Sequence, residues 1–206
     1  MLKKVLIANR GEIACRIIKT CSLMGIKTVA VFSDVDRHAM HVQTADESVF
    51  IGNSQPAESY LSIERIINAC KATDADAVHP GYGFLSENAK FCEALSKAGI
   101  TFIGPPVFAI KSMGDKIESK KIAIDAGVST IPGFLGVIED GNTAIKIANE
   151  IGYPVMIKAS AGGGGKGMRV AQNVDELIEG FSASKNEARK SFGDDRIFIE
   201  KYIERP

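Results

Sequence analysis

The chain has 206 residues, of which 45% are apolar and 24% charged, and its 25 basic and 25 acidic side chains cancel. This composition is typical of a folded globular protein, and the balanced charge gives no electrostatic reason to expect nucleic acid or an anionic membrane as a partner. The length allows one large domain or two small ones.

The N-terminus and the cysteines favour a reducing compartment. The first apolar run, Val5–Ala8, is ended by Asn9 and Arg10, so it is too short for a signal peptide or a membrane span and is interpreted as a strand. No two cysteines form a C-x-x-C pair, so we expect buried free thiols. We therefore expect a cytoplasmic protein, or a mitochondrial matrix protein if the source is eukaryotic and a presequence has been removed. The four cysteines are Cys15, Cys21, Cys70 and Cys92.

In the first hundred residues, short apolar runs alternate with segments of helical periodicity. Ser86 is expected to cap a helix that Gly99 ends, and Gly25 is expected to end the first helix. Strands that alternate with helices of this length predict an α/β fold with a doubly wound parallel sheet. The expected strands are 5–8, 28–32, 48–51, 76–79 and 101–103, and the expected helix faces are Ile13, Ile17, Ile18, Cys21 and Met24; Tyr60, Ile63, Ile67 and Cys70; and Phe91, Leu95 and Ala98.

The pattern changes at Gly104-Pro105-Pro106. Two short helices should follow, the second beginning at Asp115 with Glu118 in the capping-box position. Farther on we expect a small α+β unit with strands at 154–159, 168–171 and 197–200, in which the glycine-rich run joins two antiparallel strands. A helix capped by Asn173 with Glu176 should carry Val174, Leu177, Ile178 and Phe181 on one face. The predicted division is residues 1–113, a connecting helical segment 114–130, and a unit at 131–206.

The most informative motif is the glycine-rich run 162–167 between Lys158 and Met168. Glycines let backbone N–H groups approach an anion, and Lys158 and Lys166 add positive charge for phosphate oxygens. A Walker A loop is excluded because Gly167, not Ser or Thr, follows Lys166. A dinucleotide loop is disfavoured because a strand, not a helix, follows. A glycine flap between two strands that closes over ATP phosphates fits best, and a flexible linker is the alternative.

Three further motifs are weaker when taken singly. Lys116, in Met113–Lys116, lies in the first turn of a helix, where a solvated surface lysine is the alternative. Asn9–Glu12 turns a strand into a helix and could bind an anion or be purely structural. The run His79–Asn88 follows the fourth strand at the carboxyl edge of the sheet, where α/β proteins bind ligands, although a lone histidine there is often structural.

With these motifs in this order, the whole chain resembles the biotin carboxylase family of ATP-grasp enzymes. The finer pattern is most similar to the α subunits of propionyl-CoA carboxylases, in GDKIESK at 114–120, TIPGF at 130–134 and FGDDR at 192–196. Acetyl-CoA, pyruvate and methylcrotonyl-CoA carboxylases share the main motifs. The alternatives are another ATP-grasp ligase, such as a carbamoyl-phosphate or peptide-type ligase, and a non-enzymatic nucleotide-binding module. The main motifs lie at 7–14, 79–88, 113–116, 152–167 and 199–202.

The resemblance implies an ATP-dependent ligase in which ATP converts bicarbonate to carboxyphosphate and CO₂ is then passed to biotin. Lys116 and Lys158 would hold ATP phosphates, and the glycine loop would fold over them and exclude water. By the same resemblance, the loop residues at the phosphates are Gly163, Gly164, Gly165, Lys166 and Gly167. The residues implied around the adenine are Met168, Glu200, Lys201 and Ile203. The residues implied on the biotin and bicarbonate side are His79, Tyr82, Gly83 and Glu87.

The same resemblance implies Mg²⁺ or Mn²⁺, and biotin carried on a domain outside this chain. The implied partners are that biotin carboxyl carrier domain and a carboxyltransferase β subunit, in a homodimer or a larger hetero-oligomer, with no nucleic acid and no membrane. The metal ligands and catalytic residues are expected after Pro206. The chain is therefore expected to be the N-terminal part of an ATP-grasp enzyme, with the C-terminal half of the ATP-grasp absent and no activity by itself.

Overall fold

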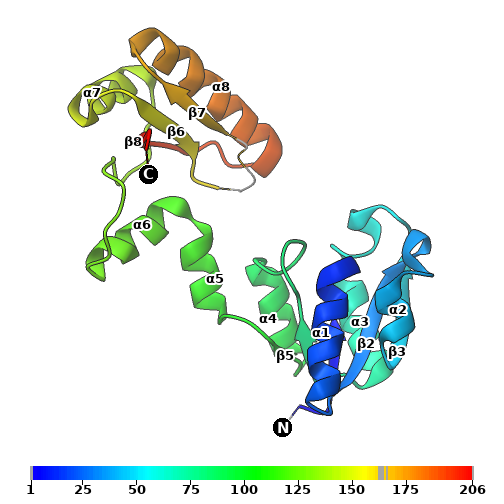
Figure 1. Cartoon of the computed structure of the whole chain (residues 1–206). Helices are drawn as coiled ribbons and strands as arrows, with labels where there is room; N and C mark the ends of the chain where they lie inside the picture. The colour runs from blue at the N-terminus through cyan, green and yellow to red at the C-terminus, as the bar shows by residue number, and fades with distance from the viewer. Residues whose placement is uncertain (1, 162–164, 166, 206) are drawn as a thin grey trace. The chain divides into compact units, whose positions relative to one another are not determined.

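The structure is a computed structural model that describes residues 2–161, 165 and 167–205. The chain folds as two compact units, Met1–Ile110 and Lys111–Pro206. Helix α5, Val107–Gly114, lies where one unit gives way to the next (Figure 1).

The first unit is built on a five-stranded sheet whose strands are all parallel. The strand order β3-β2-β1-β4-β5 places the first strand in the middle, as expected for a doubly wound fold. This confirms the predicted architecture. The strands are β1 Lys4–Ile7, β2 Lys27–Ser33, β3 Glu47–Gly52, β4 Ala77–His79 and β5 Thr101–Phe102.

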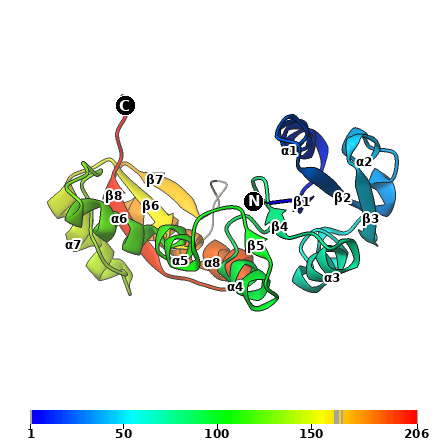
Figure 2. The same ribbon diagram turned by 90° about the horizontal axis from the view of Figure 1, so that it is seen from below.

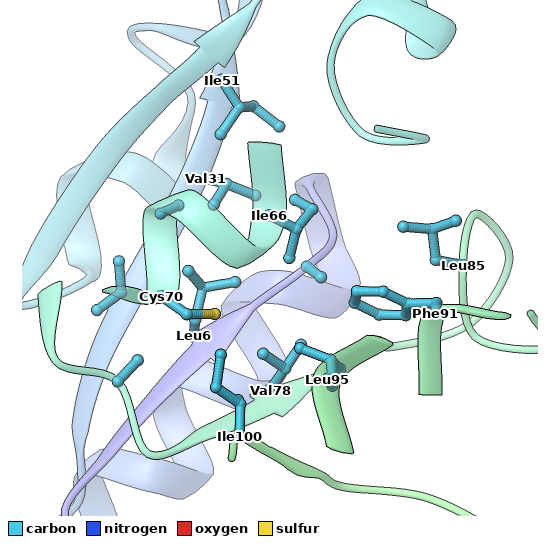
Figure 3. Close-up of a cluster of buried hydrophobic side chains, with 14 of the residues drawn as sticks. Leu6, Val31, Ile51, Ile66, Cys70, Val78, Leu85, Phe91, Leu95 and Ile100 are labelled. Carbon is cyan, nitrogen blue, oxygen red and sulfur yellow. The ribbon is translucent and has the colours of Figure 1, made fainter. Parts of the chain in front are cut away.

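Helices cover both faces of this sheet, and Figure 2 shows α1 and α3 on opposite sides of it. Alternate residues of β1 point to opposite faces, so Leu6 packs with Ile66 and Phe91 in one core (Figure 3), while Ile7 packs with Ile17 in the other. The helices are α1 Gly11–Leu23, α2 Met40–Thr44, α3 Ile63–Thr73 and α4 Ala89–Lys97, with short 3₁₀ turns η1 Asp34–Asp36 and η2 Pro56–Glu58.

Three details of the first unit differ from expectation. Helix α4 begins later than predicted, because Asn88, not Ser86, accepts a hydrogen bond from the Phe91 N–H as its N-cap. Tyr60 is buried but lies before α3 rather than on its face. Met24 follows the end of α1 and is exposed, so it takes no part in the core.

The second unit contains a three-stranded antiparallel sheet of order β7-β6-β8. The predicted antiparallel strands on either side of the glycine-rich run are thereby confirmed. Asp115 caps α6 through the N–H groups of Ile117 and Glu118, as predicted. The elements are α6 Lys116–Asp125, α7 Gly141–Ile151, β6 Val155–Ala159, β7 Met168–Ala171, α8 Val174–Phe192 and β8 Ile197–Lys201.

Helices α7 and α8 lie on one face of the small sheet (Figure 1), where Val155, Ile157 and Ala159 of β6 form the core with them. Asn173 caps α8 as predicted. The buried stripe of α8 runs through Leu177 and Phe181 to Ala188, whereas Val174 and Ile178 are exposed, contrary to expectation. The intermediate residues of β6, Met156 and Lys158, point to the opposite face of the sheet.

All four cysteines are free thiols, as expected. Three are buried, and Cys15 is partly exposed, which departs from the expected full burial. Burial raises the pKa of the Cys70 thiol to about 12. No helix within the described residues is long and apolar enough to cross a membrane.

Candidate functional site

The second unit holds a buried carboxylate between two ammonium groups. Glu200 accepts a short hydrogen bond from Lys158 through Oε1 and a second from Lys120 Nζ, 3.1 Å away, through Oε2. The Glu200 side chain is 7% exposed, that of Lys120 10% and that of Lys158 21%. Each carboxylate oxygen thus has one cationic partner, and the more exposed of the two cations is Lys158.

Strand alternation and helix periodicity bring these three residues together. Met156 pairs with Glu200 and Lys158 with Phe198 across β6 and β8, so Glu200 is the diagonal neighbour of Lys158 on the sheet face away from α7 and α8. Lys120 follows Lys116 by four residues on α6, and residues at that spacing share one face of a helix.

The start of α6 is held at the end of β6. The Lys116 N–H donates to the carbonyl of Ser160, directly after β6, at 3.3 Å. Asp115 accepts from the Ser160 hydroxyl at 3.1 Å and forms an ion pair with Arg196 at 2.8 Å. Burial opposes ionisation of Asp115, but the Glu118 N–H and the Arg196 guanidinium outweigh it and lower the pKa of the carboxyl. The two predicted phosphate ligands, Lys116 and Lys158, therefore come from adjoining backbone segments.

Residues 132–134 lie beside β8 and are hydrogen-bonded to it. The Lys201 N–H donates to the Pro132 carbonyl at 2.8 Å, and the Phe134 N–H donates to the Ile199 carbonyl at 3.0 Å. Gly133 forms a bridge with Glu200, and a Cβ at Gly133 would lie 2.6 Å from the Glu200 Cβ. Only glycine allows this close approach.

The residues predicted around the adenine are placed differently from one another. Met168 pairs with Lys158 across β6 and β7, so the two side chains share a face. Ile203 is exposed just beyond β8. The Lys201 ammonium, in contrast, donates to the carbonyls of Gly152 and Tyr153 at 2.9 and 2.8 Å. The Lys201 side chain therefore binds the backbone between α7 and β6.

The glycine-rich run is only partly described. Gly163, Gly164 and Lys166 lie outside the described residues. Gly165 and Gly167 have φ angles of +80° and +70°, which favour glycine, and a Cβ at Gly167 would lie 2.9 Å from the Ala159 Cβ.

In the first unit, Asn9 joins the turn after β1 to the loop after β4. Its amide Nδ2 donates to the carbonyls of Pro80 and Tyr82, both at 2.8 Å, and its Oδ1 accepts from the Arg10 N–H at 2.9 Å. Because β1 and β4 are neighbouring parallel strands, both segments lie at the same edge of the sheet. Residues 9–13 and 82–84 line an open cavity of about 320 Å³.

The Arg10 side chain faces a buried acid, Asp36. Asp36 also accepts hydrogen bonds from the hydroxyls of Tyr60, at 2.7 Å, and Ser33, at 3.2 Å. Hydrogen bonds from Arg10 outweigh the effect of burial and, with Tyr60, lower the pKa of Asp36 to about 2. Burial and the bond to Asp36 raise the pKa of Tyr60 to about 12. The Tyr60 ring stacks on Phe84, with centroids 5.1 Å apart, so this network reaches the loop after β4.

The four residues predicted on the biotin and bicarbonate side all belong to this loop or its strand. His79 Nδ1 accepts a hydrogen bond from the Gly81 N–H at 3.0 Å, and burial lowers the pKa of the imidazole. Tyr82 and Glu87 are exposed, and Gly83 has a φ of +68°. Tyr82 and Gly83 line the cavity at 9–13, whereas His79 lines an apolar cavity of about 390 Å³ beside α1.

Sequence reasoning missed Lys120, Asp36 and the amide of Asn9 as parts of these arrangements. Lys120 carried a signal, its four-residue spacing from Lys116. Among the described residues, no group of three or more His, Cys, Asp or Glu side chains could hold a metal ion. Because both oxygens of Glu200 already face ammonium groups, this carboxylate does not fit a Mg²⁺ site either.

A parallel sheet unit followed by a small antiparallel unit is the fold shared with solved biotin carboxylases of the ATP-grasp class. Residues 1–110 match the model of the biotin carboxylase N-terminal domain, and residues 115–206 match that of the ATP-binding domain of the carbamoyl-phosphate synthase L chain. The chain therefore belongs to the biotin carboxylase family, whose members are ATP-dependent ligases.

Relatives support this assignment. The propionyl-CoA carboxylase alpha chain of Ruegeria pomeroyi is 64% identical over 206 residues, 100% of this chain and 30% of that relative. A β-γ-ATP complex of Campylobacter jejuni biotin carboxylase has a TM-score of 0.97 at 47% identity and covers 100% of this chain and 46% of its own. The Hydrogenobacter thermophilus 2-oxoglutarate carboxylase biotin carboxylase domain dimer, in complex with MgADP, ADP and bicarbonate, has a TM-score of 0.94 at 49% identity, covering 99% and 45%. The chain thus spans less than half of each.

Proposed function

We propose that this chain supplies the nucleotide-binding part of a biotin carboxylase, with ATP as its nucleotide. The observation that carries this proposal is the meeting of α6 and β6, where Lys116 and Lys158 come from segments joined by the hydrogen bond between the Lys116 N–H and the Ser160 carbonyl. Two lysines on adjoining segments, one of them shortly before a glycine-rich run in the sequence, suit a polyphosphate. The β-γ-ATP and the ADP named in the complexes of the related structures support it.

In the whole protein, the reaction we propose is ATP-dependent carboxylation of carrier-bound biotin. Bicarbonate oxygen takes the γ-phosphoryl group of ATP and releases ADP; the resulting carboxyphosphate delivers CO₂ to biotin and releases phosphate. Lys116 and Lys158 would bind and orient phosphate oxygens, and the run 162–167 would exclude water. Mg²⁺ or Mn²⁺ would be held by residues outside those described, and it would neutralise charge on the phosphate oxygens.

We propose that the loop after β4 faces the bicarbonate and biotin side of the whole enzyme. Tyr82 and Gly83 line a cavity with the turn after β1, and Asn9 holds the loop in place. Glu87 is exposed near the same sheet edge, and His79 ends β4. In this proposal the His79 side chain holds the backbone of the loop in place, because its Nδ1 accepts a hydrogen bond from the Gly81 N–H.

The acyl substrate of the whole protein is proposed to be propionyl-CoA. The supporting observation is the 64% identity to a propionyl-CoA carboxylase alpha chain, against 49% to a 2-oxoglutarate carboxylase. The proposed partners are a biotin carboxyl carrier domain, a carboxyltransferase β subunit and a second biotin carboxylase copy. Turnover of acetyl-CoA, pyruvate or methylcrotonyl-CoA in preference to propionyl-CoA by the assembled enzyme would contradict this assignment.

Nucleotide binding is tested by titrating the chain with ADP and following backbone amide signals by NMR. Saturable binding is expected, and Lys158→Met should weaken it by about tenfold or more, since a charge-assisted phosphate contact is lost. The exposed Lys19→Met in the first unit is the matched control and should leave the affinity unchanged. No saturable binding by the wild-type chain would refute the proposal.

The carboxylation proposal has its own test. The 206 residues with Mg²⁺, ATP and free biotin should show no bicarbonate-dependent ATP cleavage, whereas the longer protein should. Bicarbonate-stimulated cleavage by the chain alone would mean that the catalytic residues lie within it and would contradict the proposed roles of its residues.

A further inference from the structure

One carboxylate, that of Glu200, has two ammonium partners in the second unit, and only one of them was expected at the nucleotide. Lys158 and Lys120 contact different oxygens of this carboxylate. We propose that Lys120 is a positioning residue: it keeps Glu200 paired when Lys158 leaves that carboxylate for a nucleotide phosphate. This inference rests on the proposed ATP site and adds a residue to it.

The burial of Glu200 makes the second lysine necessary. Its side chain is 7% exposed, so a charge left there without a partner is poorly solvated. If Lys158 were its only cationic partner, a nucleotide that bound Lys158 would leave the buried carboxylate unpaired. The free energy of that unpaired charge would weaken nucleotide binding. With Lys120 in contact with Oε2, the carboxylate remains paired throughout.

The geometry also distinguishes which lysine moves. Lys158 is the more exposed of the two and lies two residues before Ser160, where the chain enters the glycine-rich run. Lys120 is 10% exposed and lies one helical turn beyond Lys116 on α6. Three charged groups with two positive charges and one negative also leave a net positive charge, which attracts a polyphosphate.

The test compares ADP with adenosine, because Lys120 acts through Lys158, and the Lys158 ammonium is proposed to contact the phosphates alone. NMR titrations of the 206-residue chain measure both ligands for the wild type and for Lys120→Met. The substitution should weaken ADP binding by about tenfold and adenosine binding by less than about twofold, because a stranded buried charge opposes only the phosphate contact. Lys120→Arg, which keeps the cation, should restore ADP affinity to within about threefold of the wild type.

A second arm removes the carboxylate. In a Glu200→Gln background nothing can be stranded, so adding Lys120→Met should change ADP affinity by less than about twofold. This arm keeps the inference testable even if Lys120→Met alone folds poorly. A tenfold loss in the Glu200→Gln background would show that Lys120 contacts the phosphates itself and would overturn the positioning role.

The remaining outcomes separate this inference from the proposed function. Equal losses for ADP and adenosine, or unchanged ADP affinity in Lys120→Met, would overturn the inference while wild-type ADP binding still supported the nucleotide site. A wild-type chain that fails to bind ADP would overturn both.

Discussion

The Arg10 guanidinium and the Asp36 carboxylate form two side-by-side hydrogen bonds, with Nε 2.7 Å from Oδ2 and Nη2 2.5 Å from Oδ1. Arg10 follows β1 and Asp36 follows β2, two adjacent strands. The pair therefore joins two turns at the carboxyl edge of the parallel sheet. Tyr60 extends the connection, because it donates to Asp36 and stacks on Phe84.

Asp36→Asn should lower the free energy of unfolding, since it removes the charge that Arg10 and Tyr60 face. Asp36 has a folded pKa of about 2 against an ordinary value of 3.8, so its ionisation contributes about 2 kcal/mol at neutral pH. Because the folded pKa is depressed, this contribution is present above about pH 4 and is lost as the pH falls toward 2.

Urea unfolding of the wild type and of Asp36→Asn across this range measures the effect. The stability difference should shrink as the pH is lowered from about 4 to about 2. Asp46, whose pKa is also lowered to about 2, is present in both proteins and cancels in the difference. A difference that stays constant with pH would contradict the coupling of Asp36 to Arg10.

Asn9→Ala should loosen the loop after β4. The substitution leaves the carbonyls of Pro80 and Tyr82 without their amide donor, at a cost of about 1–3 kcal/mol. Amide hydrogen exchange should accelerate at residues 81–86 more than in β1 or β2. Asn53→Ala is a suitable control, because the bond from Asn53 to the exposed Glu58 is on the surface and its loss should have little effect. Uniform acceleration over the whole first unit would indicate general destabilisation instead.

Gly133→Ala should destabilise the second unit by about 1–3 kcal/mol, because the new Cβ would press on the Cβ and Cα of Glu200 at 2.6 and 2.7 Å. Thermal unfolding monitors the loss. Gly141→Ala is the matched control, because Gly141 lies in the first turn of α7 and its added Cβ would meet no atom within 4 Å beyond its chain neighbours and the backbone of its own helix. Equal melting temperatures for the two variants would argue against the close approach of Gly133 to β8.

Lys201→Met and Lys158→Met should separate stability from binding. Lys201 donates to the carbonyls of Gly152 and Tyr153, so its loss should lower the unfolding free energy by about 1–3 kcal/mol. Its effect on ADP affinity should be several-fold smaller than that of Lys158→Met. A loss of ADP affinity in Lys201→Met as large as that in Lys158→Met would place the Lys201 ammonium at the nucleotide.

Local patterns predicted the elements well where the pattern and the chemistry agree. Asp115 and Asn173 predict the starts of α6 and α8, because each is a side-chain N-cap directly before its helix. The prediction that Tyr60 lies on the face of α3 was wrong. Tyr60 fits the helical spacing of Ile63 and Ile67, but the helix begins only after its cap, Ser62. Its burial comes instead from Asp36 and Phe84, contacts that no local spacing encodes.

The residues of the candidate site also fall into those that local sequence patterns identify and those that only tertiary packing brings together. Lys158 could be singled out because glycines follow it, and Lys116 because a lysine in the first turn of a helix is unfavourable to the helix dipole; its phosphate role came from the family resemblance. Lys120 and Glu200 meet across 80 residues of sequence, and Asp36 meets Arg10 across 26. Such ion pairs depend on how helices and strands pack, so residue type and spacing alone could not identify them.

Strand β6 places Lys158 on one face and Ile157 and Ala159 in the core on the other. A two-residue repeat of this kind makes the strand intolerant of a change in length. A one-residue deletion at Met156 would turn the ammonium toward α8 and an isoleucine toward Glu200. Natural variation and protein engineering should therefore keep the alternation of core and opposite-face residues within Val155–Ala159, while insertions and deletions are confined to the segments on either side.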